Sequence, residues 1–325
     1  MLKTFNYVDI MWKYCEKLHI NSLCIFSLPA TSKLMDARTQ VVNLPIWNGQ
    51  KVDPQPLSGG MTNVNFVVEN AGKKYVVRIG DDIPQHQVKR FNELASSKAA
   101  YAVGISPEVI YHESGALVIA YVESHTLNEE DVRKQKMLSR ILPLIKRCHQ
   151  DVSSELRGPV LMFWVFHLFR DYAHSLHSRN SHWCSVIPDL LQQAEKLEKA
   201  VGQIDVVFSH NDLLAANFLD DGERLWLIDW DYAGFNSPLF DLGGLASNNS
   251  LDEKAEVWLL ENYFEKSVGA LLWHQYSAMK CASILRESMW GMVSEHFSKM
   301  DIDYRKYSSE NLQRFNKAYD IFINS

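Results

Sequence analysis

The sequence predicts an α+β fold, in which a small antiparallel sheet precedes a mostly helical region. Two early segments, 57–79 and 105–123, each contain two apolar strands joined by a turn. From about residue 127 onward helical patterns dominate, apart from one short hairpin near residues 218–228. We therefore divide the chain into an extension of unknown role (1–36), a small sheet lobe (37–123) and a mostly helical lobe (124–325).

The composition favours a soluble enzyme over nucleic-acid-binding and membrane proteins. The formal charge of -6 and the pI near 6.1 come without a basic patch, which argues against nucleic-acid binding. No apolar stretch of the sequence reaches membrane-spanning length. The five cysteines are odd in number and lack metal-binding spacing, which points to a reducing compartment. We expect a cytoplasmic protein, with a helix at Tyr7–Leu18 in the extension.

The segment around Asp212 carries the strongest functional signal. Four residues separate Asp212 from Asn217, and Asp229 ends the apolar run 225–228. This is the spacing of a kinase catalytic loop, in which the Asp accepts the proton of a substrate hydroxyl and the Asn binds magnesium. Asp229 adds a second oxygen ligand of the kind that magnesium prefers. The sequence therefore predicts that ATP and Mg²⁺ serve the phosphorylation of an alcohol, with Asp212 as the catalytic base.

His210 lies two residues before the predicted base and has two interpretations. A histidine in such a loop can titrate during catalysis, or it can hold the loop by a hydrogen bond to the backbone near Asp229. We favour the structural role, because imidazole is widely used to orient its neighbours.

A second group of residues is typical of a site for nucleotide phosphates. Gly59 and Gly60 form a turn that lets backbone amides approach phosphates, although an ordinary hairpin fits this turn equally well. Arg78 ends the returning strand, where its planar guanidinium can pair with phosphate oxygens. Glu93, in the helix that follows, is placed to pair with Arg78, and an exposed helical Glu is the alternative.

The second hairpin leads into the expected hinge between the two lobes. Its last strand runs from Leu117 to Glu123. We expect backbone groups near Ala120 and Val122 to meet the adenine ring of ATP.

Taken together, these motifs resemble the choline/ethanolamine kinase family, within the larger aminoglycoside-phosphotransferase-like group. The resemblance runs from about residue 44 to the C-terminus and implies a protein-kinase-like two-lobed fold. The motifs that match in order are Gly59-Gly60 with Asn63, Arg78, Glu93, His210-Asn211-Asp212 with Asn217, and the segment 228–232. The resemblance implies that Asp212 is the base and that Asn217 and Asp229 bind magnesium. It also implies that the nucleotide is bound by Gly59, Gly60, Asn63, Arg78 and Glu93.

The resemblance also suggests roles for two further aspartates. Asp231 occupies a position where the family usually has Glu, so the carboxylate is kept. Asp241 resembles a family aspartate that braces the catalytic loop, although a helix N-cap is an equally good interpretation of this residue.

The C-terminal region resembles the part of choline kinases where a Trp-Gly helix closes the alcohol site. A quaternary ammonium needs aromatic faces around it. Trp290 and Tyr232 are the candidates for that cage, whereas Trp230 is better explained as a core residue. Two positions depart from the family pattern: the second tail aromatic falls at Val293, and an expected acidic residue falls at Asn248.

The sequence thus predicts a kinase for a small cationic amino alcohol, because Asp212 and Asp231 would attract an ammonium group. Choline is the first candidate, and ethanolamine, an aminoglycoside or another small alcohol are the alternatives. A catalytically silent nucleotide-binding regulator is the alternative from another class, and the intact Asp212, Asn217 and Asp229 speak against it. The enzyme would serve phospholipid or lipopolysaccharide precursor metabolism. Its oligomeric state, a homodimer included, stays open.

Overall fold

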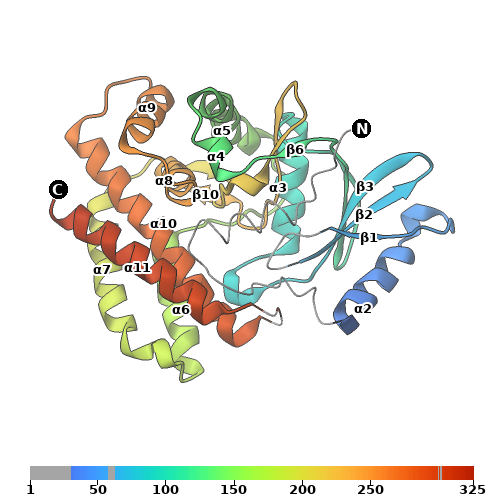
Figure 1. Ribbon diagram of the computed structural model, residues 1–325, viewed down its shortest axis with the longest axis horizontal. Coiled ribbons are helices and arrows are strands. Elements are labelled where there is room, and N and C mark those ends of the chain that lie inside the picture. Colours follow the sequence, from blue (N-terminus) through green and yellow to red (C-terminus); the bar gives the residue numbers. More distant parts are fainter. Residues whose placement is uncertain (1–30, 58–62, 299, 301) are drawn as a thin grey trace. The chain divides into compact units, whose positions relative to one another are not determined.

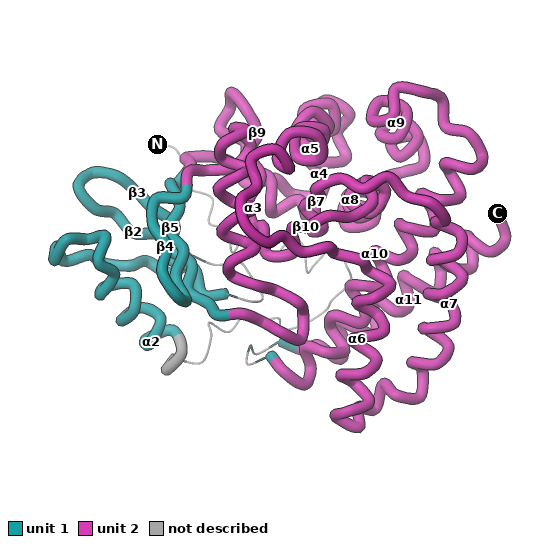
Figure 2. The backbone as a smooth tube through the Cα atoms, turned by 180° about the vertical axis from the view of Figure 1, so that it is seen from behind, with its two compact units in different colours: residues 1–81, 109–121, 298–302 teal, residues 82–108, 122–297, 303–325 magenta. Residues whose placement is uncertain are grey.

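The computed structural model describes residues 31–57, 63–298, 300 and 302–325. The predicted helix at Tyr7–Leu18 and the glycines Gly59 and Gly60 lie outside these residues. The chain divides into two compact units, which Figure 2 shows in different colours. The smaller unit holds residues up to 81, 109–121 and 298–302, and the larger unit holds 82–108, 122–297 and 303–325.

A five-stranded antiparallel sheet forms the smaller unit, with the strand order β1-β2-β3-β5-β4. Its strands are β1 (Gln55–Leu57), β2 (Val64–Asn70), β3 (Lys73–Ile79), β4 (Val109–Glu113) and β5 (Ala116–Ala120). The β2–β3 hairpin turns at Ala71 and Gly72, and both have positive φ, which matches the right-handed twist of the strands. The turn that the sequence predicts within the segment 57–79 is thus confirmed.

Helix α2 (Thr31–Val42) and the 3₁₀ turn η1 (Pro45–Trp47) provide much of the core of the smaller unit. Ala37, Val41 and Trp47 are buried there with Phe66 and Val118 of the sheet. The helix begins at Thr31, so the ordered lobe includes part of the segment that the sequence analysis assigned to the extension (1–36). Its apolar residues are spaced for one helical face, and that face covers the sheet.

The larger unit is mostly helical, and short β-strands interrupt its helices. The helices are α3 (Arg90–Ala102), α4 (Glu129–Val132), α5 (Gln135–Glu155), α6 (Val165–Ser178), α7 (Ile187–Val201), α8 (Pro238–Asn248), α9 (Glu253–Phe264), α10 (Ala270–Phe297) and α11 (Tyr304–Ile323). Strands β6 (His125–Thr126), β8 (Phe218–Asp220) and β9 (Leu225–Leu227) form one sheet, and β7 (Val207–Ser209) pairs with β10 (Gly234–Asn236). Together with the smaller unit, these elements confirm the predicted α+β, protein-kinase-like class of fold.

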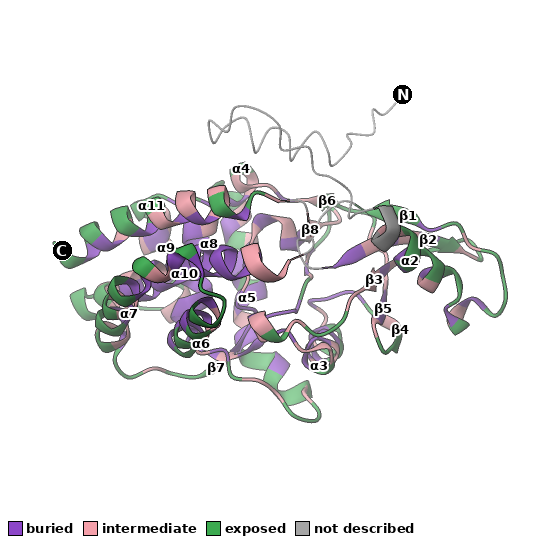
Figure 3. Cartoon of the chain, turned by 90° about the horizontal axis from the view of Figure 1, so that it is seen from below, coloured by how far each residue is buried: buried purple, intermediate pink, exposed green. Residues whose placement is uncertain are grey.

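Helix α10 is the central element of the larger unit and packs against α6, α7, α8 and α11. Figure 1 shows α10 (orange) and α11 (red) running side by side, and Figure 3 shows α10 buried over much of its length. Gly291 permits the close approach of α10 and α11, because a Cβ atom there would lie 2.5 Å from Ser308 Oγ and 2.7 Å from the Tyr307 ring. A helix that is apolar on most sides belongs in a core, as α10 does.

The first strand of the predicted hairpin 105–123 begins later in the chain than expected, at Val109. Pro107 cannot donate a backbone hydrogen bond, and the carbonyl of Ile105 accepts one from Leu227 in the larger unit, so these residues are not part of the strand. No helix among the described residues has the length and apolar character needed to cross a bilayer.

Candidate active site

The predicted catalytic loop follows β7 and is held in place by the side chain of Asn217. The amide Nδ2 of Asn217 donates to the backbone carbonyl of Asp212 at 2.8 Å. Asn211 adopts φ +66°, which reverses the chain just before Asp212. Because Nδ2 is used by the loop, the amide oxygen of Asn217 is the atom that can serve a metal ion.

Asp229 lies next to Asn217 because the two segments are hydrogen-bonded. The backbone nitrogen of Ile228 donates to the carbonyl of Asn217 at 3.0 Å, and β9 pairs with β8 directly before this point. Asp229 itself has φ +67°, a left-handed conformation that costs free energy in a residue other than glycine and is concentrated at functional sites. An amide oxygen and a carboxylate on adjacent segments suit a magnesium ion, which prefers hard oxygen ligands.

His210 hydrogen-bonds the backbone at two positions, Ile228 and Asp212. Its Nε2 lies 2.9 Å from the carbonyl oxygen of Ile228, and its Nδ1 accepts from the backbone N–H of Asp212 at 3.3 Å. These contacts require the neutral tautomer with the proton on Nε2. Burial lowers the pKa of His210, which also favours the neutral ring. His210 thus makes the backbone contact near Asp229 that its structural role requires.

Asp241 fixes the start of the predicted catalytic loop. Its two carboxylate oxygens accept from the backbone N–H groups of His210 and Asn211 at 2.8 and 2.7 Å, and His149 Nε2 lies 2.9 Å away. Burial is the largest single effect and raises the pKa of Asp241, but the hydrogen bonds and charges of His149 and His210 together outweigh it, so the pKa is lowered. The N-cap of α8 is Ser237, so the N-cap interpretation of Asp241 is wrong: the residue lies one turn inside the helix.

The environment of Asp212 moves its pKa toward neutrality. Burial is the main cause and raises the pKa to about 7. The nearby Arg286 guanidinium acts in the opposite direction and lowers it, whereas the carboxylate of Glu287 raises it. A carboxyl group with a pKa near the working pH can accept and release a proton readily, as a general base requires.

Two charged residues beside the predicted base, Arg286 and Glu287 of α10, were not predicted from the sequence. Arg286 Nη1 lies 2.6 Å from Glu287 Oε1 and 3.5 Å from Asp212 Oδ1. The hydroxyl of Tyr307 donates to the other oxygen of Glu287 at 2.6 Å. Adjacent opposite charges in an otherwise apolar stretch of helix were the signal that could have identified them.

Tyr232 and Trp290, the predicted aromatic cage, do lie together. Trp290 Nε1 donates to the Tyr232 hydroxyl at 2.8 Å. His86 stacks on Trp290 with ring centroids 5.0 Å apart, and burial lowers the pKa of His86 to about 3, so this ring is uncharged. Tyr304 and Tyr307 meet Trp290 edge-on. The cage role of Tyr232 and Trp290 stays a prediction.

The remaining residues discussed for the alcohol site are Trp230, Val293 and Asn248. Trp230 is buried and donates to Ser106 Oγ at 3.1 Å, in agreement with its interpretation as a core residue. Val293 is fully buried in α10, and Asn248 is the last residue of α8.

Asp231 and Glu93 share one cation. Arg90 Nη1 lies 2.6 Å from Asp231 Oδ1 and 2.8 Å from Glu93 Oε2, and all three side chains are largely buried. Arg90 was not singled out by the sequence analysis. The predicted pair of Glu93 with Arg78 would join a residue of each unit, and it stays a prediction.

The other residues predicted to bind the nucleotide lie in strands of the smaller unit or close to a strand end. Asn63 directly precedes β2, and Arg78 lies in β3 opposite Leu117 of β5. Ala120 ends β5, and Val122 belongs to the larger unit. The contacts of these residues with a nucleotide stay predictions.

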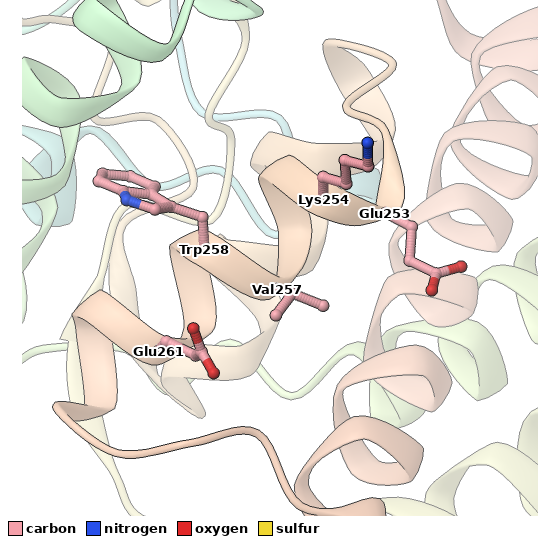
Figure 4. Close-up of a pocket in the computed structure, with 5 residues that line it drawn as sticks. All are labelled: Glu253, Lys254, Val257, Trp258 and Glu261. Atoms are coloured by element: carbon pink, nitrogen blue, oxygen red, sulfur yellow. The ribbon is translucent and has the colours of Figure 1, made fainter.

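A surface hollow on α9 is unrelated to these residues. It is lined by Glu253, Lys254, Val257, Trp258 and Glu261. Figure 4 shows the side chains of Trp258 and Glu253 pointing in opposite directions, so the hollow lacks converging polar groups.

The chain is similar to known proteins. The family model described as choline/ethanolamine kinase matches residues 55–260. The chain belongs to this family. Its predicted assignment to a family of kinases is therefore confirmed, and the matched segment contains Asp212, Asn217 and Asp229.

Individual relatives agree with the family assignment. The protein LicA of Haemophilus influenzae is 31% identical over 215 residues, which are 63% of this chain and 61% of that protein. Ethanolamine kinase 2 of Mus musculus is 24% identical over 303 residues, 85% of this chain and 78% of that protein. The crystal structure of a choline/ethanolamine kinase family protein from Mesorhizobium loti superposes with a TM-score of 0.72 at 25% identity, covering 88% of this chain and 94% of the other. The chain thus spans less than two thirds of the LicA protein.

Proposed function

We propose that this protein transfers the γ-phosphoryl group of ATP to the hydroxyl of a small cationic amino alcohol. One observation carries the proposal: Asp212, with a pKa raised to about 7, is hydrogen-bonded to Asn217, and Asn217 adjoins Asp229. In the proposed mechanism, the base thus lies beside two oxygen ligands for a metal ion. Membership of a kinase family supports the same reaction.

In this mechanism Asp212 orients the alcohol and accepts its proton as the phosphoryl group is transferred. The transition state is loose, so the proton is taken late and positioning matters more than strong basicity. The amide oxygen of Asn217 and the carboxylate of Asp229 would hold Mg²⁺, which neutralises charge on phosphate oxygens when it is bound. His210 and Asp241 keep the loop in place through their backbone hydrogen bonds.

At the nucleotide end, the proposal assigns the phosphates to the turn with Gly59, Gly60 and Asn63 and to Arg78. Arg78 lies in β3, in the centre of the sheet, where a strand fixes the direction of its side chain. Ala120 and Val122 would offer backbone groups to the adenine ring.

The charges around Asp212 favour a cationic alcohol. Three acidic side chains lie in the same buried region as Tyr232 and Trp290, and they outnumber the two arginines, Arg90 and Arg286, that pair with them. The three acids are Asp212, Asp231 and Glu287. Choline is the first substrate to test and ethanolamine the second, because both combine a hydroxyl with a positive head group of this size. The cytoplasmic location and the role in phospholipid or lipopolysaccharide precursor metabolism belong to the same proposal.

The proposal is tested by measuring ADP release over a panel of choline, ethanolamine, homoserine, thiamine and an aminoglycoside. We expect choline or ethanolamine to stimulate ADP release most. Asp212→Ala should abolish turnover and leave ATP binding near normal, whereas Asp229→Ala should remove Mg²⁺-dependent nucleotide binding. ATP binding without ADP release for any alcohol would contradict the proposal and favour a silent nucleotide-binding regulator.

A further inference from the structure

Arg286 takes up the space in which a substrate cation is expected. Its guanidinium carbon lies 4.2 Å from the centroid of the Tyr232 ring, in a cation–π contact. Its Nη1 also lies 2.6 Å from Glu287 Oε1 and 3.5 Å from Asp212 Oδ1. An aromatic face and nearby carboxylates are the groups that a positively charged head group would use.

Two nitrogens of the Arg286 guanidinium, with three N–H donors between them, lack a hydrogen-bond partner among the described residues. The side chain is 5% exposed, and these two nitrogens are Nε and Nη2. Leaving buried donors unpaired costs free energy, so such groups are rare and often functional. Because the third nitrogen, Nη1, lies 3.5 Å from Asp212 Oδ1, the guanidinium as a whole adjoins the proposed base.

The other aromatic surfaces of the predicted cage are also covered. His86 stacks on Trp290, and Tyr304 and Tyr307 meet the same indole edge-on. A trimethylammonium group has no N–H donor and depends on open aromatic faces. A primary ammonium has three N–H donors and can bind carboxylate oxygens without an aromatic face.

We propose that Arg286 is a specificity-determining residue that makes this site favour alcohols with a primary ammonium over alcohols with a quaternary one. This proposal rests on the proposed function and refines its choice of substrate. Arg286 covers the face of Tyr232 that a trimethylammonium needs. Glu287, whose carboxylate has lone pairs beyond those used by Arg286 and Tyr307, remains an acceptor for the N–H groups of a primary ammonium.

The test compares kcat/KM for choline and ethanolamine in the wild type and in two variants. Arg286→Ala opens the Tyr232 face, and Arg286→Gln removes the charge while keeping a planar polar group. We expect the choline-to-ethanolamine ratio of kcat/KM to rise at least about fivefold in Arg286→Ala, the effect of one cation–π contact, and to rise less in Arg286→Gln. Lys280→Ala, which removes another ion-paired cation of α10, should leave the ratio unchanged.

Each outcome has a defined meaning. A ratio that stays within twofold of the wild type, or falls, in the Arg286 variants would overturn the specificity role while leaving the kinase activity intact. Wild-type protein that phosphorylates neither alcohol would overturn the proposed function and this inference together. Arg286→Gln carries the test if Arg286→Ala fails to fold, because it keeps most of the side-chain volume.

Discussion

Asn217 donates a hydrogen bond from its side-chain amide to the backbone carbonyl of Asp212 at 2.8 Å. The proposed base and a proposed metal ligand are therefore parts of one rigid loop. The next link is the hydrogen bond from Ile228 to the carbonyl of Asn217, which brings Asp229 to the same place. A change at Asn217 should disturb metal binding and the position of the base together.

Replacing Asn217 tests this coupling. Asn217→Ala removes both the metal-binding oxygen and the loop hydrogen bond, so we expect kcat to fall roughly 100-fold or more. Asn217→Asp keeps an oxygen ligand and should retain part of the activity at high Mg²⁺. The measurement is kcat as a function of Mg²⁺ concentration. Asn262→Ala is the matched control, since that amide also donates to a backbone carbonyl but lies on α9; equal losses in the two Ala variants would contradict the coupling.

The pKa of Asp212 predicts a pH dependence. A carboxylate base works when deprotonated, so kcat/KM should rise with pH through a midpoint of about 7. Arg286 lowers this pKa and Glu287 raises it, so Arg286→Gln should move the midpoint up and Glu287→Gln should move it down. The profiles are measured at saturating Mg²⁺ and ATP. A wild-type profile that stays flat down to pH 5 would rule out this assignment.

The hydrogen bonds of Asp241 predict that its replacement lowers the unfolding free energy of the protein. Asp241→Ala leaves the buried N–H groups of His210 and Asn211 without their acceptor, which should cost about 2–4 kcal/mol of unfolding free energy. Asp241→Asn keeps one acceptor oxygen and should cost less. Urea unfolding measures both. The control Asp252→Ala removes the exposed N-cap of α9 and should cost about 1 kcal/mol. An Asp241→Ala loss no larger than this would show that the hydrogen bonds of Asp241 to the loop do not stabilise the protein.

The close packing at Gly291 predicts that alanine is tolerated less well at this position than at Gly244. Gly291→Ala would push a Cβ into Ser308 and Tyr307, and we expect a loss of about 1–3 kcal/mol with a raised KM for the alcohol, because Tyr307 holds Glu287. Gly244→Ala on α8 meets only Ser283 Oγ at 3.4 Å and should be tolerated. Thermal unfolding and steady-state kinetics compare the two variants. Equal tolerance of both would mean that α10 and α11 can separate without cost.

The parts of the fold and site that could be predicted from the sequence are the local ones. The β2–β3 hairpin follows from its turn residues, and the adjacency of Asn217 and Asp229 follows from a short loop and a short strand. These depend on residues close together in the chain. The fold class followed from the same patterns, since apolar strand runs precede a long stretch of helical periodicity.

The parts that could not be predicted depend on contacts between distant segments. Arg286 reaches Asp212 across more than seventy positions, and nothing in the periodicity of α10 shows which of its faces meets the catalytic loop. Arg90 likewise reaches Asp231 across 141 positions. The two interpretations of Asp241 could be separated only when Ser237 proved to be the N-cap of α8.

The central claim is that Asp212 serves transfer of a phosphoryl group to an amino alcohol. The most direct measurement is ³¹P NMR of the product formed from ATP, Mg²⁺ and choline or ethanolamine by the wild type and by Asp212→Asn. The account predicts a new phosphomonoester signal of the alcohol with the wild type, and its loss in Asp212→Asn while ATP still binds. A phosphorylated alcohol formed equally by both proteins would contradict it.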